Sequence, residues 1–341
     1  MRIGYACVNQ GLTNRPKKLG GPITTSRTAR KATWYPNNYQ LLGERALLNA
    51  TDLLHYLKWN EEHGIRLFRI GSELIPWHDQ YELSKLPQLQ EIKDRLFEAG
   101  EYARAHGHRL TTHPGPFHVL GSPNIEVAER SIIGLERHSE MFDMMGYEPS
   151  FENKINIHVG GMYGNAELTA SRWIASWHRL SDNLKKRLVL ENDDKPSMWS
   201  VQMIYDFFHR EIGIPITFDY FHHSFHTSGL SEEEALKLAA STWPEGVTQC
   251  THYSESRRDE KKHTLMTICE NNSIDFDNLE DWPTFAGLKK EWGKIRVQAH
   301  ADYCKKPINT YGLDIDIVLE AKGKEDALMK SIEINKEILA C

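Results

Sequence analysis

Short runs of apolar residues, most of them ended by a histidine or an acidic residue, recur along the whole chain. Eight runs are predicted to form β-strands, at residues 2–8, 66–70, 108–113, 153–159, 187–191, 214–219, 247–252 and 313–320. Between them, apolar residues return every three or four positions, which is typical of helices with one buried face. The predicted helices cover residues 41–63, 88–106, 124–145, 167–184, 198–210, 231–241 and 324–339.

The alternation of strands and helices predicts an α/β fold built on a parallel sheet. Eight such units in 341 residues, with no linker between them, favour a (β/α)₈ TIM barrel that fills residues 1–341 as one domain. An open, doubly wound sheet is the alternative. Two segments depart from the repeat: a long loop at 10–39, of a length that is usually functional, and a charged segment at 253–299 that we interpret as an insertion before the last strand.

Composition places the chain among ordinary soluble globular proteins, with 40% hydrophobic and 26% charged residues. No run approaches the roughly 20 apolar residues of a membrane helix, and no apolar signal segment opens the chain. The five cysteines lack CxxC spacing, which suits a reducing compartment. We therefore expect a cytoplasmic protein that does not contact membranes. The lack of a GxGxxG motif or a P-loop argues against a nucleotide cofactor.

The charge distribution adds a second expectation. The net charge of −6 argues against a protein that coats nucleic acid nonspecifically, because such proteins are normally basic. Residues 15–31, however, hold six arginines and lysines and no acidic residue. Such a loop can bind phosphates, particularly where bound metals neutralise nearby acidic residues. The alternative is a solvated loop without a ligand.

Polar residues at the ends of the predicted strands are the candidates for chemistry. In a TIM barrel the carboxyl ends of all strands face one another across one mouth. On seven strands these ends, or the turns after them, carry His78, His113, His158, Glu191, Asp219, His252 and Glu320, and nearby loops add His222 and His300. Buried carboxylates are costly unless a cation compensates them, so the pattern predicts bound metal.

The mixture of imidazole and carboxylate ligands suits Mn²⁺, Fe²⁺ or Zn²⁺. About nine ligands, at three to four per ion, suit two or three ions, and such centres typically serve displacement at phosphorus. A structural role is the alternative for each residue: Asp219 could cap the following helix, and Glu320 could pair with Lys322 or Lys324. Because the residues recur at one end of seven strands, we favour the metal-site interpretation of the set.

At these residues the sequence resembles the UV damage endonuclease family, the barrel enzymes that nick DNA beside ultraviolet lesions. The matching stretches follow the family's order across nearly the whole chain. They are residues 2–9 (RIGYACVN), 69–76 (RIGSELIP), 112–117 (THPGPF), 119–123 (VLGSP), 157–161 (IHVGG), 190–193 (LEND), 251–254 (THYS), 300–303 (HADY) and 319–325 (LEAKGKE). Each stretch is weak alone, but the ordered set is highly specific.

The resemblance implies a site of three metal ions, usually manganese. One ion would be held by His113, His158 and Glu191, a second by Glu191, Asp219, His252 and Glu320, and a third by His222 with His300; His78 is a weaker match because its spacing after Pro76 differs. We expect four of these ligands to be catalytic: Glu191, Asp219, His252 and Glu320.

The activity that the resemblance implies is hydrolysis of the phosphodiester immediately 5′ of a pyrimidine dimer, a (6-4) photoproduct or an abasic site. The partner would be damaged double-stranded DNA, bound by a monomer in the nucleoid or, in a eukaryote, the nucleus. The residues expected against the DNA are Tyr5, Asn9, Pro116 and Phe117.

Two positions depart from the family pattern. Pro116-Phe117 stands where the family usually has Gln-Tyr or Gln-Phe as a lesion probe, and Cys250 stands where some members carry a modified lysine. An apolar wedge such as Phe117 can still unstack bases. The alternatives to a repair endonuclease are a metal-dependent sugar isomerase resembling xylose isomerase, an abasic-site endonuclease of the related barrel type, and a damage-binding protein without catalysis.

Overall fold

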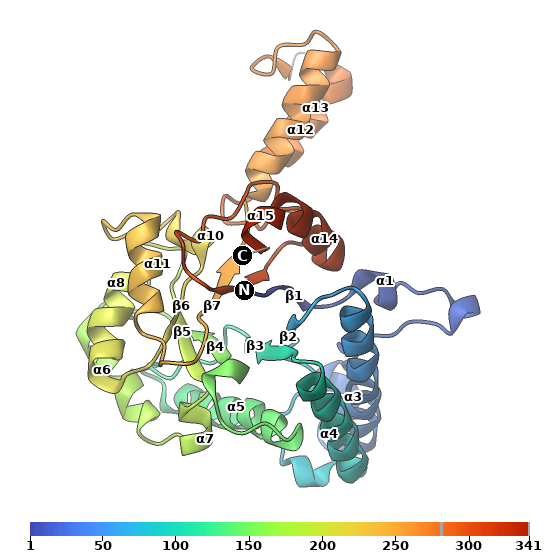
Figure 1. The fold of residues 1–341 in the computed structure, drawn as a ribbon, viewed down its shortest axis with the longest axis vertical. Coiled ribbons are helices and arrows are strands. Elements are labelled where there is room, and N and C mark those ends of the chain that lie inside the picture. The colour runs from blue at the N-terminus through green and yellow to red at the C-terminus, as the bar shows by residue number, and fades with distance from the viewer. Residues whose placement is uncertain (280–281, 340–341) are drawn as a thin grey trace.

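Eight parallel strands form the centre of the molecule (Figure 1). The structure is a computed structural model that describes residues 1–279 and 282–339. The strands are β1 (Ile3–Cys7), β2 (Leu67–Ile70), β3 (Arg109–Thr112), β4 (Ile155–His158), β5 (Leu188–Glu191), β6 (Ile216–Thr217), β7 (Cys250–Tyr253) and β8 (Asp316–Leu319). Each neighbouring pair within the sheet is parallel. The apolar residues of β5, Leu188 to Leu190, have no exposed surface, because both faces of the sheet are covered.

The sheet closes into a barrel through two residues of the predicted site. Strand order is β6-β5-β4-β3-β2-β1-β8-β7, which leaves β6 and β7 as the two edges. A parallel bridge between Asp219 and His252 joins these edges, and the His252 N–H donates to the Phe218 carbonyl at 2.9 Å. The predicted TIM barrel is confirmed. The barrel therefore closes at its mouth, where two candidate metal ligands, Asp219 and His252, are bridged.

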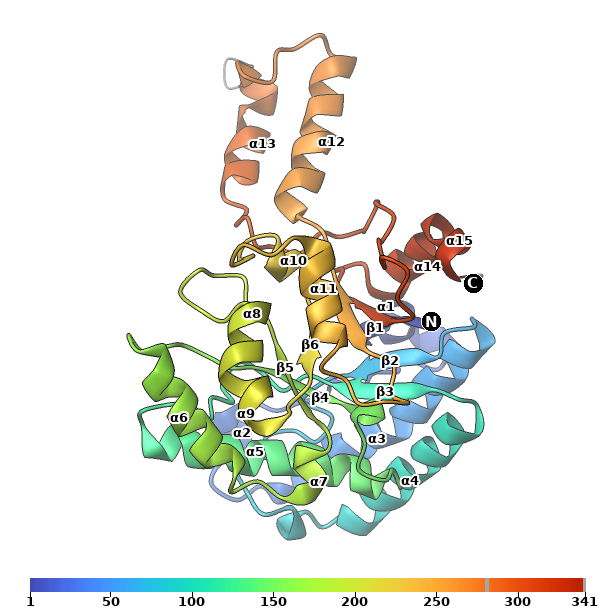
Figure 2. The same ribbon diagram turned by 60° about the vertical axis from the view of Figure 1, so that its left-hand side comes forward.

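An outer layer of helices surrounds the strands (Figures 1 and 2). The longer ones are α3 (Tyr39–Glu62), α4 (Leu89–Ala105), α5 (Ile125–Met144), α6 (Ala166–Trp177), α11 (Glu232–Ala240) and α14 (Lys324–Ile334). Helix α8 (Val201–Ile204) continues through a π-helical turn, η4 (Tyr205–His209), into α9 (Arg210–Ile212). Short segments complete the layer: α7 (Asp182–Lys185), α10 (Tyr220–His223), α15 (Lys336–Leu339), and the 3₁₀ turns η2 (Leu83–Lys85) and η3 (Phe151–Asn153).

Local chemistry explains where the elements begin and end. Ser231 and Glu234 form a capping box at the start of α11, as its serine and acidic first turn predict. The helix predicted at 167–184 is two helices, because the Ser181 side chain accepts the Leu184 N–H at 3.2 Å and begins α7 there. Strand β6 is shorter than predicted, since Pro215 has no N–H to donate to the sheet.

Residues 10–39 are partly helical rather than a plain loop. They contain α1 (Gln10–Thr13), the 3₁₀ turn η1 (Lys17–Leu19) and α2 (Lys31–Trp34). Two side chains of α3 hold the returning part of this segment: Asn49 accepts the Arg27 N–H at 2.9 Å, and Asp52 contacts the Arg27 guanidinium at 2.6 Å. The segment therefore has a defined shape along α3.

Residues between β7 and β8 form a helical hairpin outside the barrel. Helices α12 (Arg257–Asn271) and α13 (Pro283–Gly293) run side by side and project away from the strands (Figures 1 and 2). Only Leu265 and Cys269 of α12 are buried. The segment predicted as an insertion thus packs mainly on itself.

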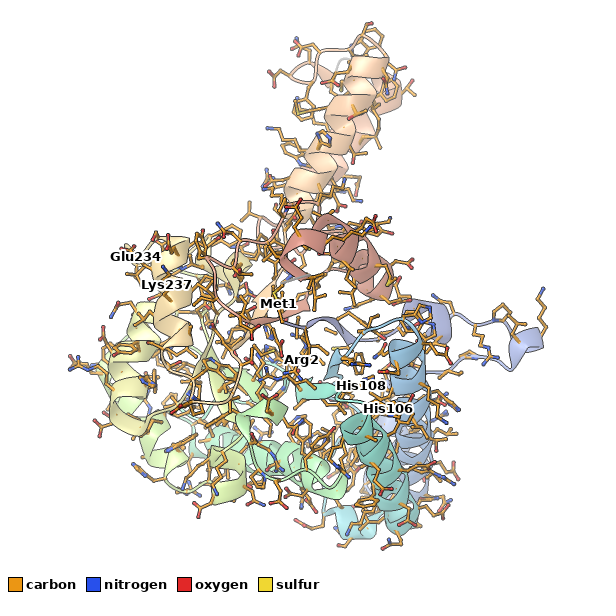
Figure 3. All side chains as sticks on the ribbon, in the orientation of Figure 1. Met1, Arg2, His106, His108, Glu234 and Lys237 are labelled. Atoms are coloured by element: carbon orange, nitrogen blue, oxygen red, sulfur yellow. The ribbon has the colours of Figure 1, made fainter. Side chains whose placement is uncertain are left out.

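A second cluster of charged residues lies at the opposite end of the barrel, at the amino ends of the strands, and includes Arg2, which is labelled in Figure 3. The Arg109 guanidinium, which is 1% exposed, contacts Asp316 Oδ2 through Nη1 at 2.9 Å. Arg2 Nε contacts the same oxygen at 2.8 Å, and Glu152 lies 3.3 Å from both arginines. Backbone carbonyls of residues 151, 152 and 248 accept further Arg109 N–H groups. Every formal charge in this cluster has an opposite partner.

Candidate metal centre

Glu191, at the end of β5, is the centre of the predicted site and has no exposed surface. Its Oε2 lies 3.1 Å from His113 Nε2 and 3.1 Å from His252 Nδ1. Its Oε1 lies 3.4 Å from His222 Nδ1, and the Asn156 amide donates to Oε2. Burial raises the pKa of a carboxyl, but the surrounding imidazoles outweigh it and hold the pKa of Glu191 well below its usual range.

Asp219, directly after β6, is the second buried carboxylate of the site. Its Oδ1 accepts the His222 N–H at 2.7 Å and so caps α10. Its Oδ2 lies 3.8 Å from His222 Nδ1. Burial and the nearby carboxylates raise the pKa of Asp219 to about 7, although His222 opposes that rise. The capping role that the sequence left as an alternative is therefore real, and it leaves Oδ2 available for a second role.

Glu320, directly after β8, is the third carboxylate. It pairs with Arg69 of β2 rather than with the lysines that follow it in sequence. His252 Nδ1 lies 3.4 Å from Oε1, and His300 Nδ1 lies 3.8 Å from Oε2. Burial raises the pKa of a carboxyl, but Arg69 outweighs it and keeps the pKa of Glu320 well below its usual range.

The imidazoles form a continuous row between these carboxylates. The His113 ring lies 5.4 Å from the His158 ring and 5.8 Å from the His252 ring. His222 lies 5.4 Å from His158 and 6.2 Å from His300. Five of the six predicted imidazoles are therefore brought together from β3, β4, β7, α10 and the segment before β8.

Hydrogen bonds to backbone carbonyls fix which ring nitrogen carries a proton in two histidines. His113 Nδ1 lies 3.0 Å from the Pro114 carbonyl, and His222 Nδ1 lies 3.0 Å from the Asn192 carbonyl. A carbonyl only accepts, so Nδ1 carries a proton in each ring. Burial lowers the pKa of His222, but Asp219 and Glu191 outweigh it and raise that pKa well above its usual value. In His113 the Nε2 lone pair is left for another atom. In His113 that lone pair faces the Glu191 carboxylate, an arrangement that a cation between them would stabilise.

Charge states differ from ring to ring. Burial lowers the pKa of His158, but Glu191 and Asp193 outweigh it and raise that pKa to about 9; His158 Nδ1 lies 3.1 Å from Asp193 Oδ1. Burial and the neighbouring Lys154 lower the pKa of His252 to about 3, despite Glu191. The site thus combines charged and neutral imidazoles within one buried cluster.

Several buried polar atoms of the cluster have no hydrogen-bond partner among the described residues. They are Glu191 Oε1, Asp193 Oδ2, Asp219 Oδ2, His252 Nδ1 and His300 Nδ1. Leaving such atoms unpaired costs roughly 1–3 kcal/mol each. Two groups offer ligand atoms within 4.8 Å of one another: His113, His158 and Glu191, and Glu191, Asp219 and His222. The donor set fits a divalent metal ion, which would satisfy these atoms.

The remaining predicted residues lie elsewhere. His78 packs against His138 of α5, with ring centroids 4.6 Å apart, and its Nδ1 lies 2.9 Å from the Ile75 carbonyl. Tyr5 and Asn9 are fully buried and joined by a 3.2 Å hydrogen bond, and Asn9 caps α1. Neither of these two side chains can contact DNA from this position.

Phe117, unlike Tyr5 and Asn9, is highly exposed. Its side chain is 84% exposed, in the turn that follows β3 and His113. Pro116 is exposed beside it. Both line a cavity of about 640 Å³ together with Trp77, His78 and His118. An exposed aromatic ring at the mouth is available to a ligand, unlike Tyr5.

Comparison with known proteins identifies the family of the chain. The model of the UV-endonuclease UvdE family matches residues 1–339. The UV DNA damage endonuclease of Clostridium perfringens is 32% identical over 342 residues, covering 99% of this chain and 71% of the relative. The chain belongs to the UvdE family. The crystal structure of SacUVDE superimposes with a TM-score of 0.74 at 27% identity, covering 99% of both chains.

Fungal members of the UvdE family are longer. The UV-damage endonuclease of Neurospora crassa is 35% identical over 318 residues, covering 78% of this chain but 47% of the relative. The chain thus spans about half the length of that protein. No helix in the described part of the chain is long and apolar enough to cross a membrane.

Cys250, one of the two positions at which the sequence departs from the pattern it resembles, has a lysine beside it. Lys154, from the turn before β4, is completely buried, and its Nζ lies 3.0 Å from the Cys250 carbonyl and 3.3 Å from His252 Nε2. Asn156 and Thr217 oxygens complete its surroundings at 3.2 and 2.8 Å. Burial lowers the pKa of Lys154 to about 8. An amino group therefore reaches this part of the site from another strand.

Several site residues escaped the sequence analysis. Arg69, Lys154, Asn156, Asn192 and Asp193 all contact predicted ligands. Arg69 lies near the carboxyl end of β2. A search for polar residues at strand ends, which identified His113, could also have identified Arg69. Lys154 directly precedes β4. Lysine is normally solvent-exposed, and nothing in the sequence pattern distinguishes this one.

Proposed function

We propose that this chain is a metal-dependent endonuclease that hydrolyses the DNA phosphodiester immediately 5′ of ultraviolet photoproducts. Pyrimidine dimers and (6-4) photoproducts are the proposed lesions, with abasic sites as further substrates. Membership of the UvdE family and the names of its relatives support the substrate class. The observation that carries the proposal is Glu191, a fully buried carboxylate within 3.4 Å of three imidazoles at the barrel mouth.

The cofactor we propose is two or three divalent ions, with manganese first and zinc or iron as alternatives. When bound, such ions activate water to hydroxide and neutralise charge on the phosphate and the leaving oxygen. The proposed ligands are His113, His158, Glu191, Asp219, His222, His252, His300 and Glu320. His78 is not among these proposed ligands, because its ring packs on His138.

Within this proposal the protein's own residues hold charge and protons in place. Glu191, Asp219, His252 and Glu320 are the proposed catalytic residues. Arg69 keeps Glu320 ionised, and the Pro114 and Asn192 carbonyls fix the Nδ1 protons of His113 and His222. Since these groups are buried and pre-positioned, they need little reorganisation during the reaction.

Lesion recognition is proposed to rest on Phe117, with Pro116 stiffening its turn. A damaged base step costs less to unstack than an intact one, so an exposed apolar ring gives selectivity without reading sequence. The exposed cations of η1, Lys17 and Lys18, are proposed phosphate contacts. We propose that one copy of the chain acts on one duplex, at the chromosome in the nucleoid or the nucleus.

The test is nicking of an end-labelled duplex that holds one defined thymine dimer. We expect a cut immediately 5′ of the dimer with Mn²⁺, no cut with chelator, and no cut of the undamaged duplex. A Glu191→Gln variant should bind the duplex without cutting it. Cutting at an abasic site only would narrow the lesion range, and no cutting on either substrate would favour a sugar isomerase or a binding protein.

A further inference from the structure

The hairpin of α12 and α13 contributes no ligand to the site, yet it is a built element. It has a small core of its own, formed by Cys269, Ile274 and Leu279 with Phe276 and Phe285 packed against it. It projects from the carboxyl end of β7, and both ribbon views show it standing clear of the barrel (Figures 1 and 2). Such an arm, held apart from the main core, offers an additional surface to a ligand at the mouth.

The root of the hairpin is fixed beside the metal centre. Ser256 and His300 form an antiparallel bridge, and the Arg257 N–H donates to the Ala299 carbonyl at 2.8 Å. Lys261 Nζ contacts Asp302 Oδ2 at 2.7 Å. Because His300 is itself part of this root, the arm and the site keep a defined relative position.

Charge is divided unevenly along the arm. The half nearest the barrel holds eight cations and three carboxylates. The cations are Arg257, Arg258, Lys261, Lys262, Lys289, Lys290, Lys294 and Arg296, and the carboxylates are Asp259, Glu260 and Glu291. The outer segment 270–279 holds Glu270, Asp275 and Asp277 and no lysine or arginine. Glu291 pairs with Lys294 within the hairpin, and the remaining cations of the inner half outnumber its carboxylates. The inner half is therefore suited to an anionic partner that lies close to the barrel.

Several of these cations gather around two aromatic rings, Trp292 on α13 and Phe276 in the segment that connects the two helices. The Arg258 guanidinium lies 4.9 Å from the Trp292 ring centre, and Lys262 and Lys289 lie 5.9 and 5.7 Å from the Phe276 ring. Phe276 and Trp292 are 5.8 Å apart. Arg258 and Lys262 are one helical turn apart on α12, so their charged groups follow one face of the arm.

Strand order places this arm across the mouth from Phe117. The hairpin follows β7 and the Phe117 turn follows β3, four strands apart in a barrel of eight. They therefore rise from opposite sides of the mouth. The basic segment 10–39 follows β1, midway between them. A duplex whose lesion sits at Phe117 and crosses the mouth reaches the inner half of the arm.

We propose that the inner half of the hairpin binds the phosphate backbone of the duplex flanking the lesion, on the side of the mouth opposite Phe117. This proposal rests on the proposed function. Arg258 and Lys262 are the contacts assigned to phosphates, with the aromatic rings holding their stems in place. A protein partner for the arm is the competing occupant.

The test measures binding of an undamaged, fluorescently labelled duplex of about 30 base pairs over 50–200 mM salt. Removing two phosphate contacts should reduce the slope of log affinity against log salt by about 1.8. The variants are Arg258→Gln/Lys262→Gln, which keep much of each stem, and Arg258→Ala/Lys262→Ala. The matched control is Lys58→Ala/Lys186→Ala, which removes two exposed charges from α3 and from the turn before β5.

The outcomes separate this proposal from the endonuclease proposal. A smaller slope in both hairpin variants but not in the control, with melting temperatures unchanged, supports the arm as a DNA contact. Equal slopes in the wild type and the hairpin variants overturn it, even if the dimer is nicked normally, and leave a protein as the occupant. A wild type that binds duplex with a salt-dependent slope but never nicks the dimer overturns the endonuclease proposal alone.

Discussion

The two ends of the barrel bury similar charges in different ways. At the amino end of the strands, Asp316 meets both Arg2 and Arg109, and carbonyl oxygens accept the remaining Arg109 protons. At the mouth, Glu191 and Asp219 are equally buried, but each keeps an oxygen without a hydrogen bond. At the amino end the charged groups are paired within the protein, whereas at the mouth carboxylate oxygens are left for a ligand.

This difference separates a structural ion cluster from a site. Each cluster contains fully or nearly fully buried charges, Arg109 and Asp316 at one end and Glu191 and Asp219 at the other, so burial alone does not distinguish them. The mouth has Arg69 as the ion-pair partner of Glu320, whereas Glu191 is met by histidines, whose charge depends on pH. The unpaired buried atoms beside titratable side chains support the proposal that a cation binds at the mouth.

The largest effect should come from removing the central carboxylate of the mouth. We expect Glu191→Gln to lower metal-dependent nicking by about 1,000-fold or more, because several kcal/mol of transition-state stabilisation depend on the bound ions. Single-turnover nicking of the dimer duplex measures this. An exposed matched control, Glu167→Gln, should cut normally. Nicking by Glu191→Gln within tenfold of the wild type would contradict the site.

The opposite end should respond in stability instead. Asp316→Ala removes the buried carboxylate partner of Arg109 and leaves only the partly exposed Glu152, and we expect the free energy of unfolding to fall by about 3–5 kcal/mol. Urea denaturation measures the loss. The nicking rate per folded molecule should stay within about twofold, since the change lies at the far end of the strands. A specific loss of nicking in a fully folded variant would break the distinction between the two ends.

Lys154 lies between the two clusters, inside the barrel. Lys154→Met keeps the volume but removes the group that contacts His252 Nε2 at 3.3 Å. We expect metal affinity to fall about 10–100-fold, as for other residues that orient a ligand, while stability changes little or rises. Calorimetric titration with Mn²⁺ measures the affinity, with Lys186→Met as the exposed control. Unchanged affinity would make Lys154 purely structural.

Phe117 should affect lesion nicking without affecting the fold. Because its ring is 84% exposed, Phe117→Ala should change the free energy of unfolding by less than about 0.5 kcal/mol. Loss of about 1–2 kcal/mol of stacking should lower nicking of the dimer duplex roughly 5–30-fold. A comparison with Phe97→Ala, an exposed ring on α4, controls for lost surface area. Equal nicking by both variants would place lesion recognition elsewhere.

The smallest expected effect is a pH dependence of the stabilisation that metal binding gives, caused by groups at the mouth. The pKa of Asp219 is raised to about 7 and that of His158 to about 9. Each raised pKa stabilises the metal-free fold at low pH, and that contribution is lost as pH rises through the folded-state pKa. Metal binding needs both groups deprotonated, so its stabilisation should grow between about pH 6 and 9. A metal-induced rise in melting temperature that shrinks over this range would contradict the assignment.

The sequence predicted the barrel and the convergence of its polar strand ends because both follow from local periodicity. Glu191, His113 and His252 end strands whose register the hydrophobic pattern sets. Arg69 as the partner of Glu320 could not be derived in this way, since it depends on which side chains face each other across the barrel. Lys322 and Lys324, which the sequence left as alternative partners, follow Glu320 in the chain, but the residue that pairs with it is Arg69.

Other features also depend on tertiary structure that the sequence pattern does not reveal. Tyr5 and Asn9 were expected against DNA by resemblance, but they bond to each other beneath the surface. The hairpin has no clear helical periodicity because only Leu265 and Cys269 of α12 are buried, so an amphipathic pattern hardly develops. Lys154 escaped because lysine is normally exposed, and only the closed barrel reveals the oxygens that surround it.

The most direct test of the account is thermal unfolding of the wild type and Glu191→Gln, each with Mn²⁺ and with chelator. We predict that Mn²⁺ raises the melting temperature of the wild type, that Glu191→Gln loses this rise, and that the two metal-free proteins melt within a few degrees of each other. Equal stabilisation of both proteins by Mn²⁺, or none of either, would contradict the claim that the buried carboxylates at the mouth form a metal centre.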